Sequence, residues 1–276
     1  MNILITGGFG LIGRNLVSEL SNNNNFNIFL ISRNNNLDNI NSNITAVEHD
    51  LIDPIPEKNI PKDINIVIHL AAIAHKTNSE TMKINCLMTK NITDAFLNKK
   101  VKFIFFSSVA VYGEANRLFP LKISDFCKPY SSYGLGKLKD EELISSSFKD
   151  FTILRLCPVI EGDDTDLLKR VYLPKTKIKY KSSYNRVYSF LSHRTIFKSI
   201  NSIIHESEIK REIINLKDSS NYNESDILKK YDGKEVKIPL FITMPLFYFL
   251  NLFSFLPKVY TINCLLTKML KSNTYE

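Results

Sequence analysis

Short apolar runs alternate with longer stretches of helical period along the first 157 residues. The runs are rich in Ile, Val and Phe, as is typical of strands buried on both faces of a parallel sheet: Asn2–Thr6, Phe26–Ser32, Ile44–Val47, Ile64–Leu70, Lys102–Ser107 and Phe151–Leu156. Between them, apolar residues recur every three or four positions and predict helices at Leu11–Leu20, Glu80–Leu97 and Ser132–Ser147. This alternation predicts an α/β fold of the Rossmann type, a doubly wound parallel sheet with a smaller C-terminal substrate lobe.

Beyond Pro158 the pattern loosens, which predicts a dinucleotide-binding domain at residues 1–157 and a substrate-binding lobe at 158–276. The nearly uncharged stretch Ile238–Leu256 is borderline in length for a membrane span, and Pro245 interrupts it. We therefore expect this stretch to form a helix that is buried or covers a dimer surface, rather than one that contacts a membrane. Alternating lysines are typical of a solvated strand edge, and here they are Lys175, Lys177, Lys179 and Lys181.

Composition adds little to this picture. The formal charge of +8 suits an anionic partner such as a nucleotide, but no basic-aromatic pattern or DNA-reading helix indicates nucleic-acid binding. The four cysteines and five histidines are scattered without metal or redox spacing, so we expect no structural metal and a reduced environment. The chain begins with a strand-like run, and we expect a cytoplasmic protein without a secretion signal.

A glycine-rich stretch joins the first strand to the first helix. Its glycines at 7, 10 and 13 serve a tight turn, a close approach of backbone to a pyrophosphate, and close packing of helix on sheet. The start of the helix supplies free N–H groups to phosphates. We therefore expect a nicotinamide dinucleotide to contact Gly7, Phe9, Gly10, Leu11, Ile12 and Gly13.

The end of the second strand bears on the choice of cofactor. An acidic residue there would bind the ribose 2′-OH of NAD, whereas this chain has Arg33, whose guanidinium suits a 2′-phosphate. NADP is favoured and NAD remains possible, since Arg33 could instead stack on adenine or face solvent. Asp50, before Leu51, could accept the adenine amino group, or act with Asp53 as a turn residue.

The candidate catalytic residues follow the fifth strand and open a later helix. Tyr133 and Lys137 are four residues apart and lie on one helical face, while Ser108 ends the strand. A phenol titrates near pKa 10, and the Lys137 ammonium would lower the pKa of Tyr133. Ser108 would bind the reacting oxygen of the substrate while Tyr133 gives or takes its proton and hydride moves to or from nicotinamide. A Tyr–Lys pair alone is common on helix surfaces, but its order after the glycine loop and the serine indicates a site.

Together these motifs resemble the extended short-chain dehydrogenases/reductases of the NAD-dependent epimerase/dehydratase family. The matching pieces cover about residues 1–165: Thr6–Gly13, Asp50-Leu51, His69–Ala72, Asn85, Ser107–Gly113, Tyr133 with Lys137, and Leu154–Pro158. The resemblance implies that Asn85 holds the sheet near the site and that Pro158 borders the nicotinamide; a helix cap and a loop proline are the alternatives. It further implies cofactor contacts at Leu51, Leu70, Ala71, Ala72, Asn85, Lys137 and Pro158.

Within the family, His69–His75 and Ile238–Leu256 resemble bacterial nucleotide-sugar enzymes of surface-polysaccharide synthesis. This implies NAD(P)-dependent reduction of a UDP-linked 4-keto sugar, with Arg186 as the candidate for the substrate diphosphate. A UDP-sugar 4-epimerase that retains NAD and a non-catalytic dinucleotide sensor are the alternatives, and a homodimer is possible. A 4,6-dehydratase is disfavoured because Val109 and Ala110 stand where that chemistry uses an acidic pair. The chain departs from the family pattern at Ser192–Arg194.

Overall fold

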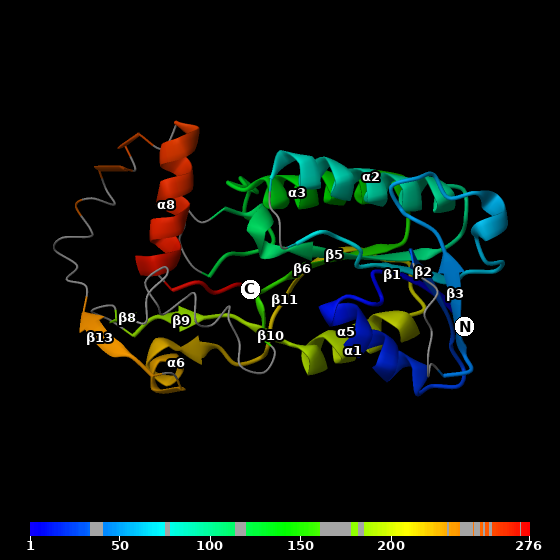
Figure 1. The fold of residues 1–276 in the computed structure, drawn as a ribbon, viewed down its shortest axis with the longest axis horizontal. Coiled ribbons are helices and arrows are strands. Elements are labelled where there is room, and N and C mark those ends of the chain that lie inside the picture. The colour runs from blue at the N-terminus through cyan, green and yellow to red at the C-terminus, as the bar shows by residue number, and fades with distance from the viewer. Residues whose placement is uncertain are drawn as a thin grey trace. The chain divides into compact units, whose positions relative to one another are not determined.

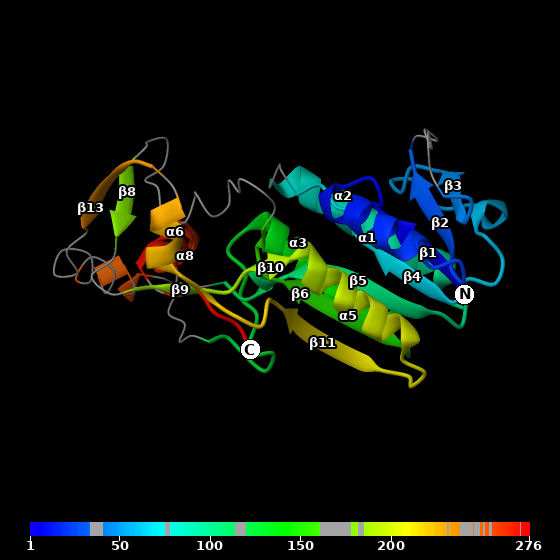
Figure 2. The same ribbon diagram turned by 90° about the horizontal axis from the view of Figure 1, so that it is seen from below.

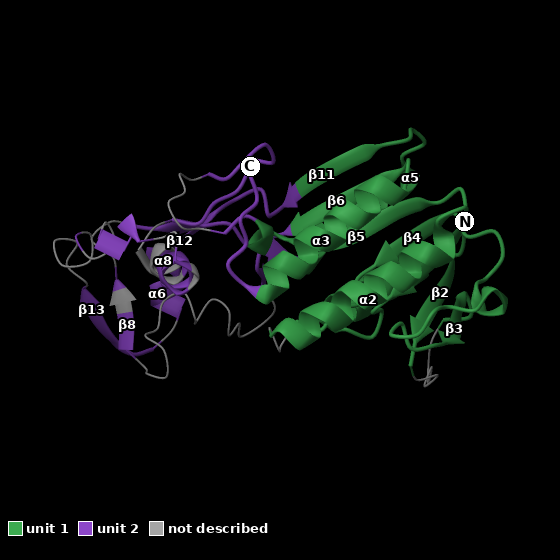
Figure 3. Cartoon of the chain, turned by 90° about the horizontal axis from the view of Figure 1, so that it is seen from above, with its two compact units in different colours: residues 1–111, 132–155, 193–214 green, residues 112–131, 156–192, 215–276 purple. Residues whose placement is uncertain are grey.

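The computed structural model describes residues 1–33, 41–74, 78–113, 120–160, 178–181, 185–230, 232–237, 245, 249–250, 252–253, 256–270 and 272–276. The chain forms two compact units (Figure 3). Unit 1 comprises Met1–Val111, Ser132–Arg155 and His193–Ile214, and unit 2 comprises Tyr112–Ser131, Leu156–Ser192 and Asn215–Glu276. The two units therefore alternate along the chain, whereas the sequence analysis placed one boundary after residue 157.

A seven-stranded sheet forms the centre of unit 1. Its strands are β1 (Asn2–Thr6), β2 (Asn27–Ser32), β3 (Ile44–Glu48), β4 (Ile66–His69), β5 (Lys102–Ser108), β6 (Phe151–Leu156) and β11 (Arg211–Leu216). Their order is β11-β6-β5-β4-β1-β2-β3, and β1 pairs in parallel with both β2 and β4. Strand order therefore reverses between β1 and β4, the point at which doubly wound sheets bind ligands. The predicted α/β Rossmann-type fold is confirmed.

Helices cover both faces of this sheet. On one face lie α1 (Leu11–Ser21) and α5 (His193–His205), and on the other lie α2 (Ser79–Phe96) and α3 (Ser132–Ser147) (Figures 1 and 2). In α2, a capping box between Asn78 and Thr81 fixes the first turn, since the Asn78 side chain accepts the Thr81 N–H and the Thr81 hydroxyl oxygen accepts the Asn78 N–H. The helices predicted in the first 157 residues are confirmed to within one residue, but neither α5 nor β11 was predicted.

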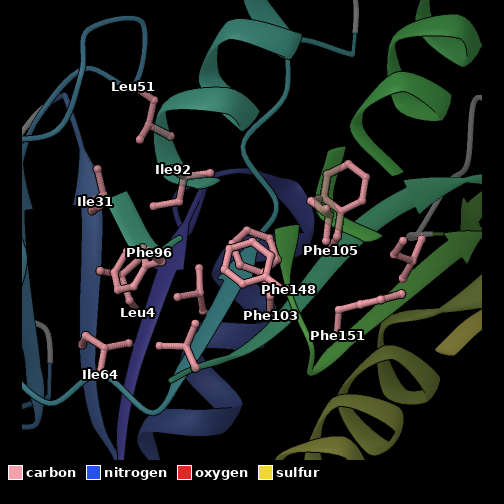
Figure 4. Close-up of a cluster of buried hydrophobic side chains, with 14 residues drawn as sticks. Leu4, Ile31, Leu51, Ile64, Ile92, Phe96, Phe103, Phe105, Phe148 and Phe151 are labelled. Carbon is pink, nitrogen blue, oxygen red and sulfur yellow. The ribbon is translucent and has the colours of Figure 1, made fainter. Parts of the chain in front are cut away.

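The main core lies between the sheet and the α2/α3 layer (Figure 4). Phe103 of β5 stacks on Phe148, with ring centroids 4.5 Å apart, and both side chains are buried. Phe96 and Ile92 of α2 reach the same cluster and are fully buried. Burying an aromatic or aliphatic side chain of this size contributes about 1.5–3 kcal/mol, so this cluster holds β4 and β5 firmly under the candidate site.

The described part of unit 2 contains short strand pairs and helices. β7 (Val159–Ile160) pairs with β10 (Leu191–Ser192), β9 (Val187–Tyr188) with β12 (Tyr222–Asn223), and β8 (Ile178–Lys181) with β13 (Lys234–Lys237). Helices α6 (Glu224–Lys230) and α8 (Pro257–Leu270) complete it. Its core includes Tyr188, Phe190, Ile227 and Leu228.

The alternating lysines do not form a uniformly solvated edge. Lys179 on β8 is buried, because its ammonium donates to the Leu228 carbonyl at 3.1 Å and lies 3.6 Å from Glu235. The expectation is therefore wrong at this position, where a hydrogen-bonded carbonyl and a carboxylate compensate the buried charge. Lys175 and Lys177 lie outside the described residues.

The apolar segment Ile238–Leu256 is described only in part. Phe249 and Leu252 are 58% and 73% exposed, so these two side chains are not buried within the chain, and a helix that covers a dimer surface stays a prediction. Among the described residues, the structure contains no helix with the length and hydropathy of a membrane span.

Candidate active site

The glycine loop between β1 and α1 has the backbone geometry that only glycine allows. Gly7 has φ +71°, and a Cβ there would lie 2.7 Å from the Ala71 nitrogen. A Cβ on Gly13 would overlap the Gly7 carbonyl oxygen and lie 2.7 Å from Gly8 Cα. Gly10 N–H donates to the Gly7 carbonyl at 3.0 Å and closes the turn. The loop therefore packs directly on the segment after β4 and against its own helix, as predicted.

A cavity of about 740 Å³ opens beside this loop. Its volume lies within the usual range for sites that bind small molecules and cofactors. Eight of the predicted cofactor residues line it: Gly7, Phe9, Gly10, Arg33, Asp50, Leu51, Ala71 and Ala72. The glycine cradle and this lining fit a dinucleotide, whose pyrophosphate would be held by the loop N–H groups.

Other predicted cofactor residues lie elsewhere. Leu11 is 61% exposed, and Ile12 lines a different groove together with residues of α5. Gly13 and Leu70 support the loop instead, since the Leu70 N–H donates to the Thr6 carbonyl at 3.2 Å. None of these four is among the residues that line the cavity, and their direct contacts with a cofactor stay predictions.

Several lining residues were missed by the sequence analysis. They are Ile31, Ser32, His49, Ile52, Ile73, Asn78, Glu80, Thr81, Ile84 and Met88. Thr81, Ile84 and Met88 lie on one face of α2, at positions i, i+3 and i+7. This spacing, on the helix that follows the His69–Ala72 motif, could have identified these three residues from the sequence.

Asp50 and Asn85 each have a clear structural partner. An Asp50 carboxylate oxygen accepts the Ile52 N–H at 3.1 Å, so Asp50 is a turn residue that also borders the cavity. The Asn85 side chain accepts the Ile73 N–H at 2.8 Å and donates to the Ile73 carbonyl at 3.2 Å. Asn85 therefore fixes the segment after β4. Pro158 belongs to unit 2, where its carbonyl accepts the Leu191 N–H at 3.0 Å.

The three candidate catalytic residues come from two neighbouring elements of unit 1. Ser108 ends β5, and its hydroxyl accepts the Ala110 N–H at 3.2 Å, at the start of the short 3₁₀ helix η2 (Val109–Val111). Lys137 of α3 donates to the Phe106 carbonyl at 2.7 Å, and its ammonium lies 4.5 Å from the Phe105 ring centroid. This bond ties α3 to the end of β5, two residues before Ser108. Tyr133 is half-buried in the first turn of the same helix.

The protonation states differ from the sequence expectation at one residue. Burial, and then the charge of Asp140, raise the pKa of Tyr133 to about 12. The expected lowering by Lys137 is absent in this structure, where the Lys137 ammonium is directed at the Phe106 carbonyl. Burial lowers the pKa of Lys137 to about 8, while Asp140 and Glu141 oppose that shift. At neutral pH Tyr133 thus carries its proton and Lys137 is mostly charged.

A group of buried polar side chains behind these residues was not predicted. His69 Nδ1 lies 2.6 Å from the Thr6 hydroxyl oxygen, and His69 Nε2 lies 3.1 Å from that of Thr89. Burial, together with the charge of Lys137, lowers the pKa of His69 to about 3, so the ring is neutral. Burial raises the pKa of Asp140 to about 6, against the opposing effects of Lys137 and Thr89.

Glu141, next to Asp140 on α3, is engaged in a separate buried pair. Arg155 of β6 donates to both Glu141 oxygens at 2.7–3.2 Å, and the Ser107 hydroxyl also donates to Glu141. Both charged side chains are at most 6% exposed. This pair locks α3 onto β5 and β6.

Arg186, the candidate for the substrate diphosphate, lies in unit 2 and has a buried partner there. Its guanidinium is fully buried in unit 2 and ion-paired with Glu224, which is equally buried. Its backbone N–H also donates to Glu224 at 3.3 Å, and its guanidinium carbon lies 5.6 Å from the Tyr188 ring centroid. The charge of Arg186 is therefore compensated inside the fold, and its contact with a substrate diphosphate stays a prediction.

Comparison with known proteins places this site in context. Residues 3–166 match the model of the NAD dependent epimerase/dehydratase family. A putative UDP-glucose 4-epimerase of Methanocaldococcus jannaschii is 37% identical over 152 residues, 51% of this chain and 49% of that protein. D-erythronate dehydrogenase of Cupriavidus necator is 32% identical over 178 residues, 56% of this chain and 54% of that protein. The chain thus spans about half the length of the curated relatives it matches.

Solved structures match over more of the chain. UDP-glucuronic acid 4-epimerase from Bacillus cereus in complex with NAD has a TM-score of 0.70 at 22% identity, covering 86% of this chain and 87% of that one. UDP-N-acetylglucosamine 4-epimerase from Methanobrevibacter ruminantium has a TM-score of 0.68 at 24% identity, covering 86% and 84%. At these identities the likeness shows the fold. The family match spans residues 3–166 of 276, more than half of the chain, and the protein therefore belongs to the NAD dependent epimerase/dehydratase family.

Proposed function

We propose that this protein is an NAD(P)-dependent enzyme that interconverts a hydroxyl and a carbonyl group on one carbon of a nucleotide-linked sugar. UDP-sugars are the substrates that test this proposal most directly. The bond from Lys137 to the Phe106 carbonyl carries the proposal, at 2.7 Å. It holds the helical face of Tyr133 and Lys137 at the end of β5, where Ser108 lies. The same unit contains the glycine loop and the dinucleotide-sized cavity.

Tyr133, Ser108 and Lys137 have different roles in the proton transfer. The bound nicotinamide would supply or accept the hydride. In the reducing direction, Tyr133 gives its proton to the sugar oxygen while the carbon gains hydride, and in the oxidising direction it takes that proton back. The Ser108 hydroxyl hydrogen-bonds the same oxygen. Lys137, which donates to the Phe106 carbonyl, holds the helix that carries Tyr133 at the end of β5.

Within this chemistry, the names of similar proteins support a UDP-sugar 4-epimerase, and the NAD complex of a structurally similar epimerase supports NAD as the retained cofactor. Such an enzyme oxidises and re-reduces one carbon in each cycle. The position of Arg33 favours the second candidate, an NADP-dependent reductase of a 4-keto sugar. Its side chain is exposed and borders the cavity at the end of β2. A role in surface-polysaccharide synthesis and a homodimeric state are further proposals that come from the family resemblance.

Product analysis separates the two candidates. Purified protein is incubated with UDP-hexoses, and separately with a UDP-4-keto sugar plus NADH or NADPH, while the absorbance of reduced nicotinamide is followed. Interconversion of two UDP-hexoses without net change in nicotinamide supports the epimerase. Consumption of one reduced nicotinamide per 4-keto sugar supports the reductase. Turnover of neither substrate class, in protein shown to bind dinucleotide, contradicts the proposed function.

The cofactor preference has its own test. Arg33→Asp should weaken NADPH binding relative to NADH by about 1.5–3 kcal/mol, roughly 10- to 150-fold, if the guanidinium pairs with a 2′-phosphate. Lys58→Asp is the matched control, since it changes charge equally at an exposed position away from the cavity lining. Equal affinities of the wild-type protein for NADH and NADPH would remove the support for NADP.

A further inference from the structure

Three buried polar side chains from three elements of unit 1 meet at one carboxylate. Glu141 is on α3, Ser107 on β5 and Arg155 on β6, and each residue is at most 5% exposed. Arg155 donates to both carboxylate oxygens of Glu141 at 2.7–3.2 Å. The Ser107 hydroxyl donates to one of the same oxygens, since a carboxylate paired with a guanidinium can only accept. The Glu141 carboxylate therefore joins α3 to two neighbouring strands of the sheet.

Ser107 stands where a buried apolar residue would continue the core. Side chains alternate along a strand, so Ser107 lies on the same face of β5 as Phe103 and Phe105, which pack in the main core. The ion pair already compensates the charge of Glu141. The serine hydroxyl adds a charge-assisted hydrogen bond from α3 to the strand residue directly before Ser108.

The side of α3 that carries Glu141 also carries Tyr133 and Lys137, at intervals of four residues. Lys137 donates to the Phe106 carbonyl at 2.7 Å, and one turn further on Glu141 accepts from Ser107. Two successive turns of the helix are thus bound to two consecutive residues of β5, and two such points fix the tilt of a helix on a strand. Tyr133 lies eight residues from Glu141, about 12 Å along the helix axis, so it moves with any change of tilt.

We propose that Ser107 and Glu141 are positioning residues of this site. Their hydrogen bond sets the tilt of α3 on β5 and thereby holds the Tyr133 phenol in register with the Ser108 hydroxyl. Without the bond, this turn of α3 is tied to β6 only, and its distance from β5 is no longer fixed. A misplacement of about 1 Å in a reacting group can slow a reaction about 100-fold. The effect on catalysis rests on the proposed function, whereas the anchoring of α3 does not.

The first test uses Ser107→Ala, which removes the bond and leaves the buried ion pair in place. Single-turnover formation of reduced nicotinamide, at saturating NAD and UDP-hexose, should slow about 10- to 100-fold per bound NAD. The dissociation constant of NAD should stay at the wild-type value, because Ser107 is not among the residues that line the dinucleotide cavity. A purely structural role would lower the amount of NAD bound and leave the rate per bound NAD unchanged.

Two further variants separate positioning from packing. Ser107→Thr restores a hydroxyl at the same position and should recover most of the rate. Ser21→Ala is the matched control: Ser21 is 5% exposed at the end of α1 in the same unit, and its hydroxyl donates to the Ser18 carbonyl at 2.9 Å. It should keep the wild-type rate. A wild-type rate in Ser107→Ala, an equal loss in Ser21→Ala, or no recovery in folded Ser107→Thr overturns the positioning role.

The anchoring itself is tested without substrate, by amide hydrogen exchange. Exchange along α3 should be at least about tenfold faster in Ser107→Ala than in the wild-type protein, the low end for loss of a hydrogen bond to a charged group. Exchange along α5, on the other face of the sheet, should be the same in both proteins, and Ser21→Ala should leave α3 unchanged. Unchanged exchange along α3 in Ser107→Ala overturns the anchor. If the wild-type protein is inactive but Ser107→Ala speeds exchange along α3, the proposed function is contradicted and the anchor stands.

Discussion

Substituting alanine for the first glycine of the loop tests the account of the dinucleotide cradle. At Gly7, the backbone φ of +71° costs a residue with a Cβ about 1–2 kcal/mol. The added Cβ would lie 2.7 Å from the Ala71 nitrogen and 2.8 Å from its Cα, so two backbone segments must separate. Overpacking of this kind costs about 1–3 kcal/mol. We therefore expect Gly7→Ala to lower the free energy of unfolding by about 2–5 kcal/mol.

Binding should fall as well, since the loop N–H groups would leave their positions around the pyrophosphate. Each lost hydrogen bond to a charged group is worth about 1.5–3 kcal/mol, roughly 10- to 150-fold in the dissociation constant. Urea unfolding and titration with NADH measure the two effects. Gly136→Ala is the control, because its Cβ would meet side chains and no backbone, namely the flexible Met82 at 2.9 Å and the Cys86 sulfur at 3.7 Å, and alanine favours the helix. Wild-type stability and affinity in Gly7→Ala would refute the reasoning.

Three further perturbations test the packing and the buried charges. Arg186→Leu should lower the free energy of unfolding by about 3–5 kcal/mol because the buried Glu224 carboxylate loses its ion-pair partner, while the double variant with Glu224→Leu should recover most of it in urea unfolding; equal loss in both would contradict a structural pair. The pKa of His69 is lowered to about 3, so the free energy of unfolding of the wild-type protein should fall by about 1.4 kcal/mol per pH unit from pH 6.5 down to about 3. His69→Gln should remove this contribution to the pH dependence of stability. Phe103→Ala should cost about 3–5 kcal/mol in urea unfolding, and a loss below 1 kcal/mol would contradict its place in the core.

The first 157 residues were predictable because each element has a strong local pattern. Strands buried on both faces appear as continuous apolar runs, and β1 to β6 were found within two residues at each end. β11 was missed because only Asn215 and Leu216 are buried, so its apolar signal is weak at the edge of the sheet. α5 has a buried stripe of Ile196, Ile200 and Ile203, a signal that was present but was assigned to the substrate lobe.

The candidate site was likewise predictable in one part and not in another. The glycine loop, Ser108, Tyr133 and Lys137 were predictable because their spacing is set within single elements. The buried contacts among Thr6, His69 and Thr89 were not, since these residues come from three separate elements and their contacts depend on which polar groups the fold buries together. The pair of Arg186 with Glu224 was missed for a related reason: the two residues are 38 positions apart, and no local pattern indicates that pair.

The central claim is that Tyr133 exchanges a proton with a sugar hydroxyl while hydride moves to or from nicotinamide. Single-turnover mixing of protein, NAD and UDP-hexose, with the absorbance of reduced nicotinamide as the readout, tests it directly. Tyr133→Phe should bind NAD as the wild-type protein does but form reduced nicotinamide at least about 100-fold more slowly, the low end for loss of a general acid–base group. Tyr222→Phe, which removes a phenol bonded to Asp218 at 3.2 Å in unit 2, should behave as wild type. Reduced nicotinamide forming at the wild-type rate in Tyr133→Phe would contradict the account.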